Sequence, residues 1–150
     1  MSAYRIDGFL DNHRTIGLDT SVVIYAVEAN PKYYELVNQV FRWIQTSAAR
    51  AVTSTLTMSE ALVRPCRLGD IEGVDKFYAL LLTYPHLEWM EPTLSVADRA
   101  AQIRAEHNLR TPDAIQAATA TVAGATAFIS NDPIFRRVPG LEVLLLDEML

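Results

Sequence analysis

Cysteine is almost absent from this sequence, and long apolar runs are missing altogether. The 150 residues include one cysteine, Cys66, so an internal disulfide, and with it a disulfide-stabilised scaffold, is excluded. No apolar run reaches the ~18 residues that are needed to span a bilayer. The first residues, MSAYRIDGFLDNHR, carry acids where a secretory signal would be basic and then apolar. We therefore expect a soluble, cytoplasmic protein without a membrane partner.

Several common site patterns are missing as well. The six glycines are scattered and form neither G-x-x-x-x-G-K nor G-x-G-x-x-G, the patterns of nucleotide-binding loops. The nucleophile elbow G-x-S-x-G is absent. His13, His86 and His107 show no metal-binding spacing, and Cys66 has no histidine near it in sequence. These classes of site have no support here.

Basic side chains are outnumbered, since 13 Lys and Arg face 18 Asp and Glu, for a net charge of -5. This balance argues against a broad basic surface for nucleic acid. Only Lys32 and Lys76 are lysines. The remaining cations are arginines, which bind phosphate in bidentate fashion better than lysine does. Local phosphate contacts around an acidic site are therefore compatible with the composition.

Half of the residues are hydrophobic, and this length suits one domain with a substantial core. Buried strands are expected at 15–18, 50–56, 87–90, 125–130 and 142–146, and helices at about 31–48, 57–65, 70–82, 93–107 and 111–124. The segment 22–27 is either a buried helix or a second extended piece. Strands that alternate with helices predict a three-layer α/β/α fold with a mainly parallel sheet of four or five strands. No linker or repeat divides residues 1–150, so we expect a single domain.

Four acids occupy related places in this pattern. Asp19 and Asp132 end strands, Glu60 lies in the helix just after a strand, and Asp113 opens a helix that is nearly apolar all round. Because the carboxyl ends of parallel strands share one edge of the sheet, these acids can meet in one crevice. Two carboxylates about 4 Å apart repel by up to ~4 kcal/mol at an effective dielectric of ~20. A divalent cation relieves this, and hard oxygen ligands favour Mg²⁺ or Mn²⁺.

Each acid also has a purely structural interpretation. Asp19 or Thr20 could cap the following helix, and Thr57 with Glu60 fits a capping box. Asp113 would stabilise a helix dipole, in a helix for which Thr111 is expected as the N-cap and Pro112 as the first residue. Asp132 could cap a short turn. A shared site replaces four separate explanations with one, and we favour it.

The motifs around these acids resemble those of PIN domains of the VapC-like toxin branch, over about Thr15 to Asp147. The segments are LDTSVVIY, TSTLTMSEAL, LRTPDAIQAATA and FISNDPIF. The resemblance implies a Mg²⁺- or Mn²⁺-dependent ribonuclease that an antitoxin holds inactive. It also implies that Asp19, Glu60, Asp113 and Asp132 form the metal site, with Thr20 and Ser130 as hydroxyl support. The first fourteen residues, Met1 to Arg14, depart from the pattern as an N-terminal extension.

We therefore expect an endoribonuclease that hydrolyses RNA with metal-activated water. Candidate phosphate contacts are Arg110, Arg136 and Arg137, with Arg64 and Arg67 beyond Glu60, although solvated surface is an equally good interpretation of each. The alternatives are a non-catalytic interaction module with the same fold, and a metal-dependent nuclease outside any toxin–antitoxin system. An aspartyl-phosphate phosphatase would need an acid at Ser21.

Partners are expected on two grounds. The resemblance implies a homodimer and an antitoxin whose C-terminal segment brings a basic side chain to the carboxylates. In addition, apolar residues are more numerous than one sheet face obviously needs: Val22, Val23, Ile24, Tyr25, Val27, Tyr33, Phe41 and Trp43. We expect some of them to form an interface, with a core position for all of them as the alternative.

Overall fold

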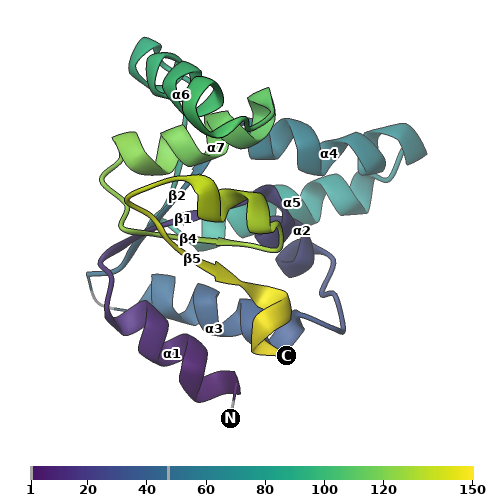
Figure 1. Ribbon diagram of the computed structural model, residues 1–150. Helices are drawn as coiled ribbons and strands as arrows, with labels where there is room; N and C mark the ends of the chain where they lie inside the picture. Colours follow the sequence, from purple (N-terminus) through teal and green to yellow (C-terminus); the bar gives the residue numbers. More distant parts are fainter. Residues whose placement is uncertain (1, 47) are drawn as a thin grey trace.

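The computed structural model describes residues 2–46 and 48–150 (Figure 1). Met1 of the expected extension, and Ser47 near the expected end of a helix, lie outside this range. Over the described residues the chain forms seven α-helices, five β-strands and two 3-10 helices. Their order is α1 (Ser2–Asp11), β1 (Thr15–Leu18), α2 (Thr20–Val27), α3 (Tyr34–Gln45), β2 (Arg50–Ser54), α4 (Leu56–Leu68), α5 (Ile71–Thr83), β3 (Leu87–Met90), α6 (Leu94–His107), α7 (Thr111–Val122), β4 (Ala127–Ser130), η1 (Pro133–Arg137), β5 (Glu142–Leu145) and η2 (Leu146–Met149).

The strands form one sheet in the order β3-β2-β1-β4-β5, and each neighbouring pair among the described residues is parallel. β1 is central, with Gly17 opposite Val52 on β2 and Phe128 on β4. All five strands therefore end at the same edge, where a ligand crevice is expected in an open α/β sheet. The predicted mainly parallel sheet is confirmed.

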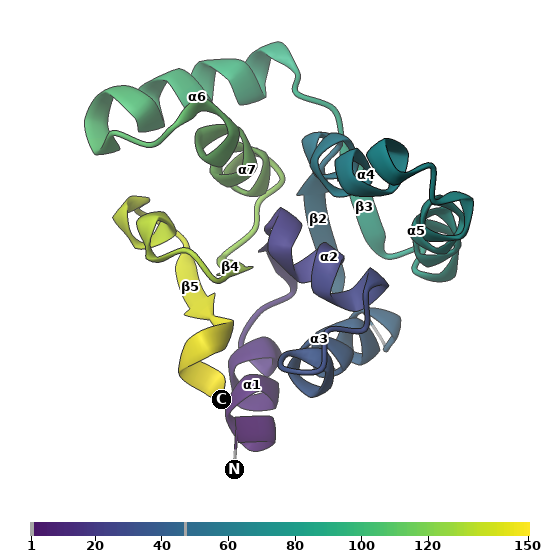
Figure 2. The same cartoon turned by 90° about the vertical axis from the view of Figure 1, so that its right-hand side faces the viewer.

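Helices cover both faces of this sheet, which confirms the three-layer α/β/α prediction (Figure 2). On one face α7 packs against β1 and β2, and α6 packs on α7. Their core includes Val52 and Phe128, with alanines of α7. On the other face α3 and α1 cover Ile16 and Leu18. Successive strand residues point to opposite faces, which explains why both faces of these short strands are apolar.

Gly17 allows α7 to lie close to the central strand. A Cβ at this position would come within 2.6 Å of the Ala120 Cβ and of the Phe128 ring. Ala117, Ala118 and Ala120 are buried in the same contact. Small residues on β1 and on α7 thus allow the helix to pack closely against the strand. This packing also positions the first turn of α7, which carries Asp113.

The segment preceding the first strand is a helix, α1, for which the sequence analysis expected no element. Ile6 and Leu10 are fully buried, and the helix packs on α3 and η2. His13 follows it, with Nδ1 2.6 Å from the Thr126 Oγ1 and Nε2 3.1 Å from the Glu142 Oε2. This segment is therefore built into the core and is not an appended arm.

Most element boundaries differ from the prediction by a few residues, and three differences concern the elements that carry the acids. The segment 22–27 belongs to the helix α2, so the extended alternative is wrong. α4 continues through Pro65 to Leu68 and stops at Gly69, whose φ is +61°. α7 begins at Thr111 with Arg110 as its N-cap, so the expected capping by Thr111 is wrong by one residue.

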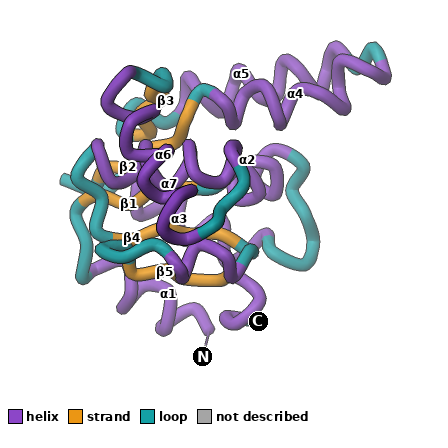
Figure 3. Tube along the Cα trace, turned by 45° about the horizontal axis from the view of Figure 1, so that its top comes forward, coloured by secondary structure: helices purple, strands orange, loops and turns teal. Residues whose placement is uncertain are grey.

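The expected apolar interface is also only partly where the sequence placed it. Val22, Val23, Tyr33 and Phe41 are buried in the core, and Trp43 packs against it, so for these residues the core alternative holds. Large exposed apolar side chains lie instead on the α4–α5 hairpin, which projects from the sheet (Figure 3). They are Val63, Leu68, Ile71, Tyr78 and Leu82. None of the described helices is long and apolar enough to cross a membrane.

Candidate functional site

Asp19 stands between the end of β1 and the start of α2. Its Oδ1 accepts a hydrogen bond from the Thr20 amide at 2.9 Å, and its Oδ2 accepts one from the Ser130 hydroxyl at 2.7 Å. Burial raises the pKa of Asp19 to about 6, against the effect of these two bonds. The charges of Asp113 and Glu60 raise the pKa further. Among the described residues no cation forms a salt bridge with this carboxylate.

Asp113 lies in the first turn of α7, where a negatively charged side chain interacts favourably with the helix dipole. Burial raises its pKa, the Arg110 guanidinium opposes this, and the Asp132 charge adds to it. The Arg110 Nε lies 3.6 Å from the Asp113 Oδ2. Asp132 is exposed and caps η1, accepting from the Ile134 amide at 3.0 Å. Asp19 thus lies within electrostatic range of Glu60 and Asp113, and Asp113 lies within range of Asp132.

Glu60 reaches the site from α4. Its Oε1 accepts a hydrogen bond from the Thr20 hydroxyl at 2.9 Å. The capping box considered for Thr57 and Glu60 is not formed, because the N-cap of α4 is Thr55 and this cap has no side-chain hydrogen bond. The N-cap interpretations of Asp19 and Asp132 do hold as geometry, so these two acids cap elements and also line the crevice.

The two hydroxyls predicted to support the site both contact it. Ser130 donates to Asp19 and accepts from the Asp132 amide at 3.0 Å. Thr20 gives its amide hydrogen to Asp19 and its hydroxyl hydrogen to Glu60. Ser130 therefore connects Asp19 with Asp132 through its hydroxyl, and Thr20 connects Asp19 with Glu60 through its amide and its hydroxyl. Their role in function remains a prediction.

Gln116 is a member of this region that the sequence analysis missed. It is 2% exposed and lies one turn after Asp113 on α7. Its Nε2 donates to the Thr57 Oγ1 at 2.8 Å and to the Thr20 Oγ1 at 3.2 Å. Nothing in the local sequence separates it from the other neutral polar residues of α7, such as Thr119 and Thr121.

The predicted phosphate-binding arginines differ in the contacts that their guanidinium groups already make. The Arg110 side chain is 82% exposed and touches the site only through Asp113. Arg136 gives two hydrogen bonds to the Glu148 carboxylate, at 2.6 and 2.9 Å. Arg137 donates to the His107 carbonyl at 3.4 Å. Arg110 is therefore the best placed of the three to bind a phosphate.

The donor set fits a hard divalent cation. It consists of carboxylate oxygens, and Asp19 is a partly buried acid without a cationic partner, which is the situation that a metal ion relieves. Within the described part of the chain, no three His, Cys, Asp or Glu side chains are already grouped as a metal cluster. Asp19, Glu60, Asp113 and Asp132 are the residues that would hold such an ion.

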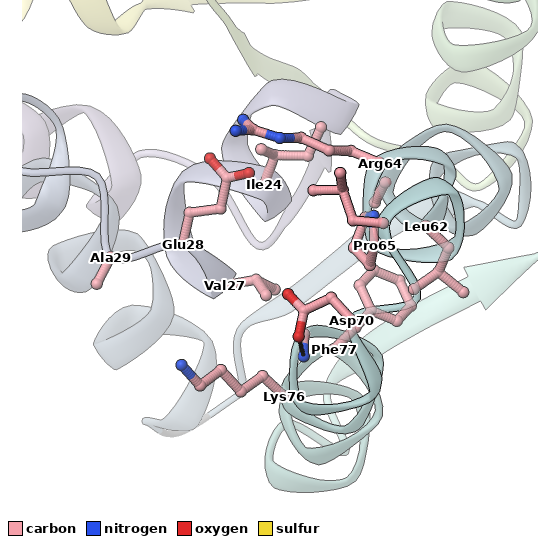
Figure 4. A pocket seen from close by; sticks show the side chains of 13 residues that line it. Ile24, Val27, Glu28, Ala29, Leu62, Arg64, Pro65, Asp70, Lys76 and Phe77 are labelled. Atoms are coloured by element: carbon pink, nitrogen blue, oxygen red, sulfur yellow. Dashed lines mark hydrogen bonds between the residues drawn. The ribbon is translucent and has the colours of Figure 1, made fainter.

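Beside the acids, α2 and the α4–α5 hairpin enclose a groove with a cavity of about 540 Å³. Figure 4 shows Ile24 and Val27 facing Leu62 and Pro65, with Glu28 and Arg64 at the rim. α4 carries both Glu60 and Arg64, four residues apart and so one turn along the same face. The lining of the groove on α4 begins at Ala61, next to Glu60 in the sequence, and none of the four acids belongs to it.

Comparison with known proteins finds a match to the family model described as PIN domain, over residues 16–141. No curated protein matches significantly. Among solved structures, VapBC2 of Rickettsia felis bound to promoter DNA has a TM-score of 0.66 at 17% identity, covering 87% of this chain and 98% of that one. DNA-bound VapBC of Salmonella typhimurium has a TM-score of 0.62 at 19% identity, covering 89% and 98%. A toxin–antitoxin complex from Klebsiella pneumoniae has a TM-score of 0.62 at 19% identity, covering 85% and 94%. At these identities the structures establish a shared fold.

Proposed function

The chain belongs to the PIN domain family, and on this premise we propose that it is a Mg²⁺- or Mn²⁺-dependent endoribonuclease that acts as a toxin paired with an antitoxin. One observation carries the proposal: hydrogen bonds of Ser130 and Thr20 connect Asp19, Glu60 and Asp132 at the carboxyl edge of a parallel sheet, and Asp113 on α7 lies within electrostatic range of Asp19. Asp19 and Asp132 also act as N-caps, but capping does not require that an acid be buried beside two other acids, as Asp19 is, where burial first and the neighbouring charges second raise its pKa.

Different residues of the chain have different roles in the proposed site. Ser130 and the Thr20 amide hold Asp19, and the Thr20 hydroxyl holds Glu60. Asp113 enters on the rigid helix α7, which Gly17 lets approach the central strand. A bound Mg²⁺ or Mn²⁺ would supply the Lewis acidity that activates water and neutralises charge on the scissile phosphate. Arg110, mostly exposed beside Asp113, would contact an adjacent phosphate.

RNA is the proposed substrate because the motifs resemble those of VapC-like PIN ribonucleases. The acids contribute four charges to a net charge of -5, so the rest of the surface is nearly neutral and need not repel RNA once these charges are compensated. Recognition of a particular RNA would depend on loops and local shape.

The proposed protein partner is an antitoxin whose C-terminal segment lies in the groove of Figure 4. The groove is largely apolar, and its lining on α4 begins at Ala61, the residue after Glu60. A chain in this position can bury apolar side chains and bring a cationic one to the carboxylates. The cation would relieve the same repulsion as a metal ion does. Metal and antitoxin should therefore compete.

Cleavage of a labelled RNA by the purified protein tests the enzymatic proposal. We expect cleavage with Mg²⁺ or Mn²⁺ and none in excess chelator, and at least a ~100-fold loss in Asp19→Asn and Asp113→Asn, because water activation depends on the carboxylate set. Asp7→Asn, at an exposed position on α1, removes the same charge away from the site and should cleave normally. Sustained cleavage in chelator, or full activity of the two site variants, would favour a non-catalytic module.

The antitoxin proposal has a separate test. The candidate partner is a small DNA-binding protein encoded immediately upstream, and its affinity should fall when Mn²⁺ is saturating. Leu68→Glu places a charge at the groove, on a side chain that is 69% exposed, and should weaken the complex without unfolding the chain. Equal affinity with and without Mn²⁺ argues against competition. A nuclease with no such partner would place the protein outside toxin–antitoxin systems.

A further inference from the structure

A chain of buried hydrogen bonds connects α7, α2, β2 and α4 directly behind the acids. Its members are Gln116, Thr20, Thr53 and Thr57, all at most 8% exposed. Thr20 adjoins Asp19, Thr57 precedes Glu60 by one turn, and Gln116 follows Asp113 by one turn. Three of the four acid-bearing elements are therefore joined through these side chains.

The orientation of the Gln116 amide follows from its neighbours. The Ser54 backbone N–H, which can only donate, lies 3.4 Å from the Gln116 Oε1. The other end of the amide, Nε2, consequently faces the two threonine hydroxyls, and it can only donate to them. Thr20 and Thr57 must both act as acceptors toward Gln116.

Thr20 and Thr57 each accept a hydrogen bond from Gln116, and each can still donate its own hydroxyl hydrogen to another group. Thr20 is 2.9 Å from the Glu60 Oε1, and an ionised carboxylate only accepts, so the Thr20 hydrogen goes to Glu60. Thr57 is 2.7 Å from the Thr53 Oγ1, and Thr53 donates its own hydrogen to the Leu18 carbonyl at 2.9 Å. The Thr57 hydrogen therefore goes to Thr53. The Gln116 amide and the two terminal acceptors, the Glu60 carboxylate and the Leu18 carbonyl, together set the hydroxyl directions in this chain.

We propose that Gln116 is a positioning residue for the acidic site: by donating to Thr20 and Thr57 it fixes the Thr20 hydroxyl toward Glu60 and so holds the Glu60 carboxylate beside Asp19. This inference rests on the proposed function. Glu60 is otherwise an exposed side chain on α4 whose one recorded hydrogen bond among the described residues is the one from Thr20. Without Gln116, Thr20 can turn its hydrogen toward Thr57, 3.2 Å away, and release Glu60.

Gln116→Met tests the proposal, because methionine has nearly the same length but neither donates nor accepts in this way. In the metal-free protein, nuclear Overhauser effects from the buried hydroxyl hydrogen of Thr20 report the rotamer of that hydroxyl, toward Glu60 or toward Thr57. We expect one rotamer in the wild type and averaging in the variant. Thr119→Val is the matched control: Thr119 is 1% exposed on the same helix and donates only to the Ile115 carbonyl. Its substitution should leave Thr20 unchanged.

Mn²⁺ affinity, measured by calorimetry, gives the second readout. We expect Gln116→Met to weaken Mn²⁺ binding at least ~10-fold and to lower kcat for RNA more than it changes KM. Thr20→Val should have a similar effect, and the double variant should be no worse than either single one, since both act through one hydrogen bond. Additive losses would indicate a merely structural role and overturn the proposal.

Different results would contradict the positioning role of Gln116 and the proposed nuclease function. If Gln116→Met keeps the single Thr20 rotamer and wild-type Mn²⁺ affinity while the wild type cleaves RNA, the positioning role is overturned and the proposed function stands. If the wild type neither binds Mn²⁺ nor cleaves RNA, the proposed function fails, and the positioning role fails with it. Should Gln116→Met not fold, Gln116→Asn retains the amide but shortens its reach, and the same rotamer and affinity measurements decide the matter.

Discussion

At the scale of single residues, Asp19 is where the fold and the proposed chemistry conflict. Burial raises its pKa from 3.8 to about 6, so the folded chain resists its ionisation. Below about pH 3 the carboxyl is largely protonated in both states and destabilises neither. As the pH rises toward 6 the unfolded chain ionises first and is favoured. The free energy of unfolding therefore falls across this window, by at most about 3 kcal/mol.

We predict that Asp19→Asn removes this dependence in the metal-free protein. Urea unfolding in chelator at several pH values between 4 and 7 should show the wild type losing on the order of 2 kcal/mol more stability than the variant. The variant should be as stable as the wild type or more so at pH 7, because Asn retains an acceptor for Ser130 but carries no charge. Parallel curves for the two proteins would show that burial of Asp19 is not costly.

The arginines give a second prediction at the residue scale. Arg110→Ala should weaken RNA binding and reduce its salt dependence, because an exposed guanidinium near the acids is free to contact phosphate. Arg136→Ala should affect RNA binding less, since this guanidinium already forms two hydrogen bonds with Glu148. Binding of an uncleaved RNA analogue at several salt concentrations measures both. A larger effect for Arg136 would reverse the assignment.

The sequence was enough to find the acids but not their support. Asp19, Glu60, Asp113 and Asp132 are recognisable because acids at strand ends or just inside helices are few, and parallel strands bring such positions together. Gln116 is different, because a neutral amide in a helix has no local signature of burial. Its role depends on three threonines that are distant in sequence, and only the packing of α7 against β2 and α2 brings them into contact.

At the scale of elements, the order of strands and helices could be predicted from the apolar segments and from the glycines and prolines between them. α4 continues past its expected end at Pro65 and stops at Gly69, because a φ of +61° suits glycine. α1 was missed although Ile6, Phe9 and Leu10 have helical spacing. A segment with only one or two amphipathic turns could be either a helix or an unstructured tail. The packing of α1 against α3 and η2 shows that it is a helix of the domain.

α1 lies outside the range matched by the PIN model, yet we predict that it stabilises the domain. Ile6 is fully buried, so Ile6→Ala should cost about 2–4 kcal/mol in the free energy of unfolding. Asp7→Ala, at the exposed neighbouring position, should change it by less than ~0.5 kcal/mol. Chemical denaturation compares the two. Similar stability for Ile6→Ala and the wild type would mean that α1 detaches in solution.

At the scale of the whole molecule, two surfaces are distinct. The acidic edge and its groove lie along α2 and the side of α4 that bears Arg64. The α5 side of the hairpin carries Ile71, Tyr78 and Leu82, which are 74%, 45% and 86% exposed. Their spacing of seven and four residues puts them on one face of α5. An apolar face on a projecting hairpin is typical of an interface with another protein.

We predict that this α5 face joins two copies of the chain. The homodimer expected from the family resemblance needs an apolar surface outside the core, and the residues first considered for it, Val22, Val23, Tyr33 and Phe41, are buried in the monomer. Light scattering should give a dimer at tens of micromolar. Ile71→Glu combined with Leu82→Glu should give a folded monomer, because two buried charges at a symmetric contact would face their own copies. Leu94→Glu, on α6 at 91% exposure, adds the same charge elsewhere and should remain dimeric. A wild-type protein that is monomeric at this concentration would remove the homodimer, and a dimer that survives the double substitution would place the contact on another face.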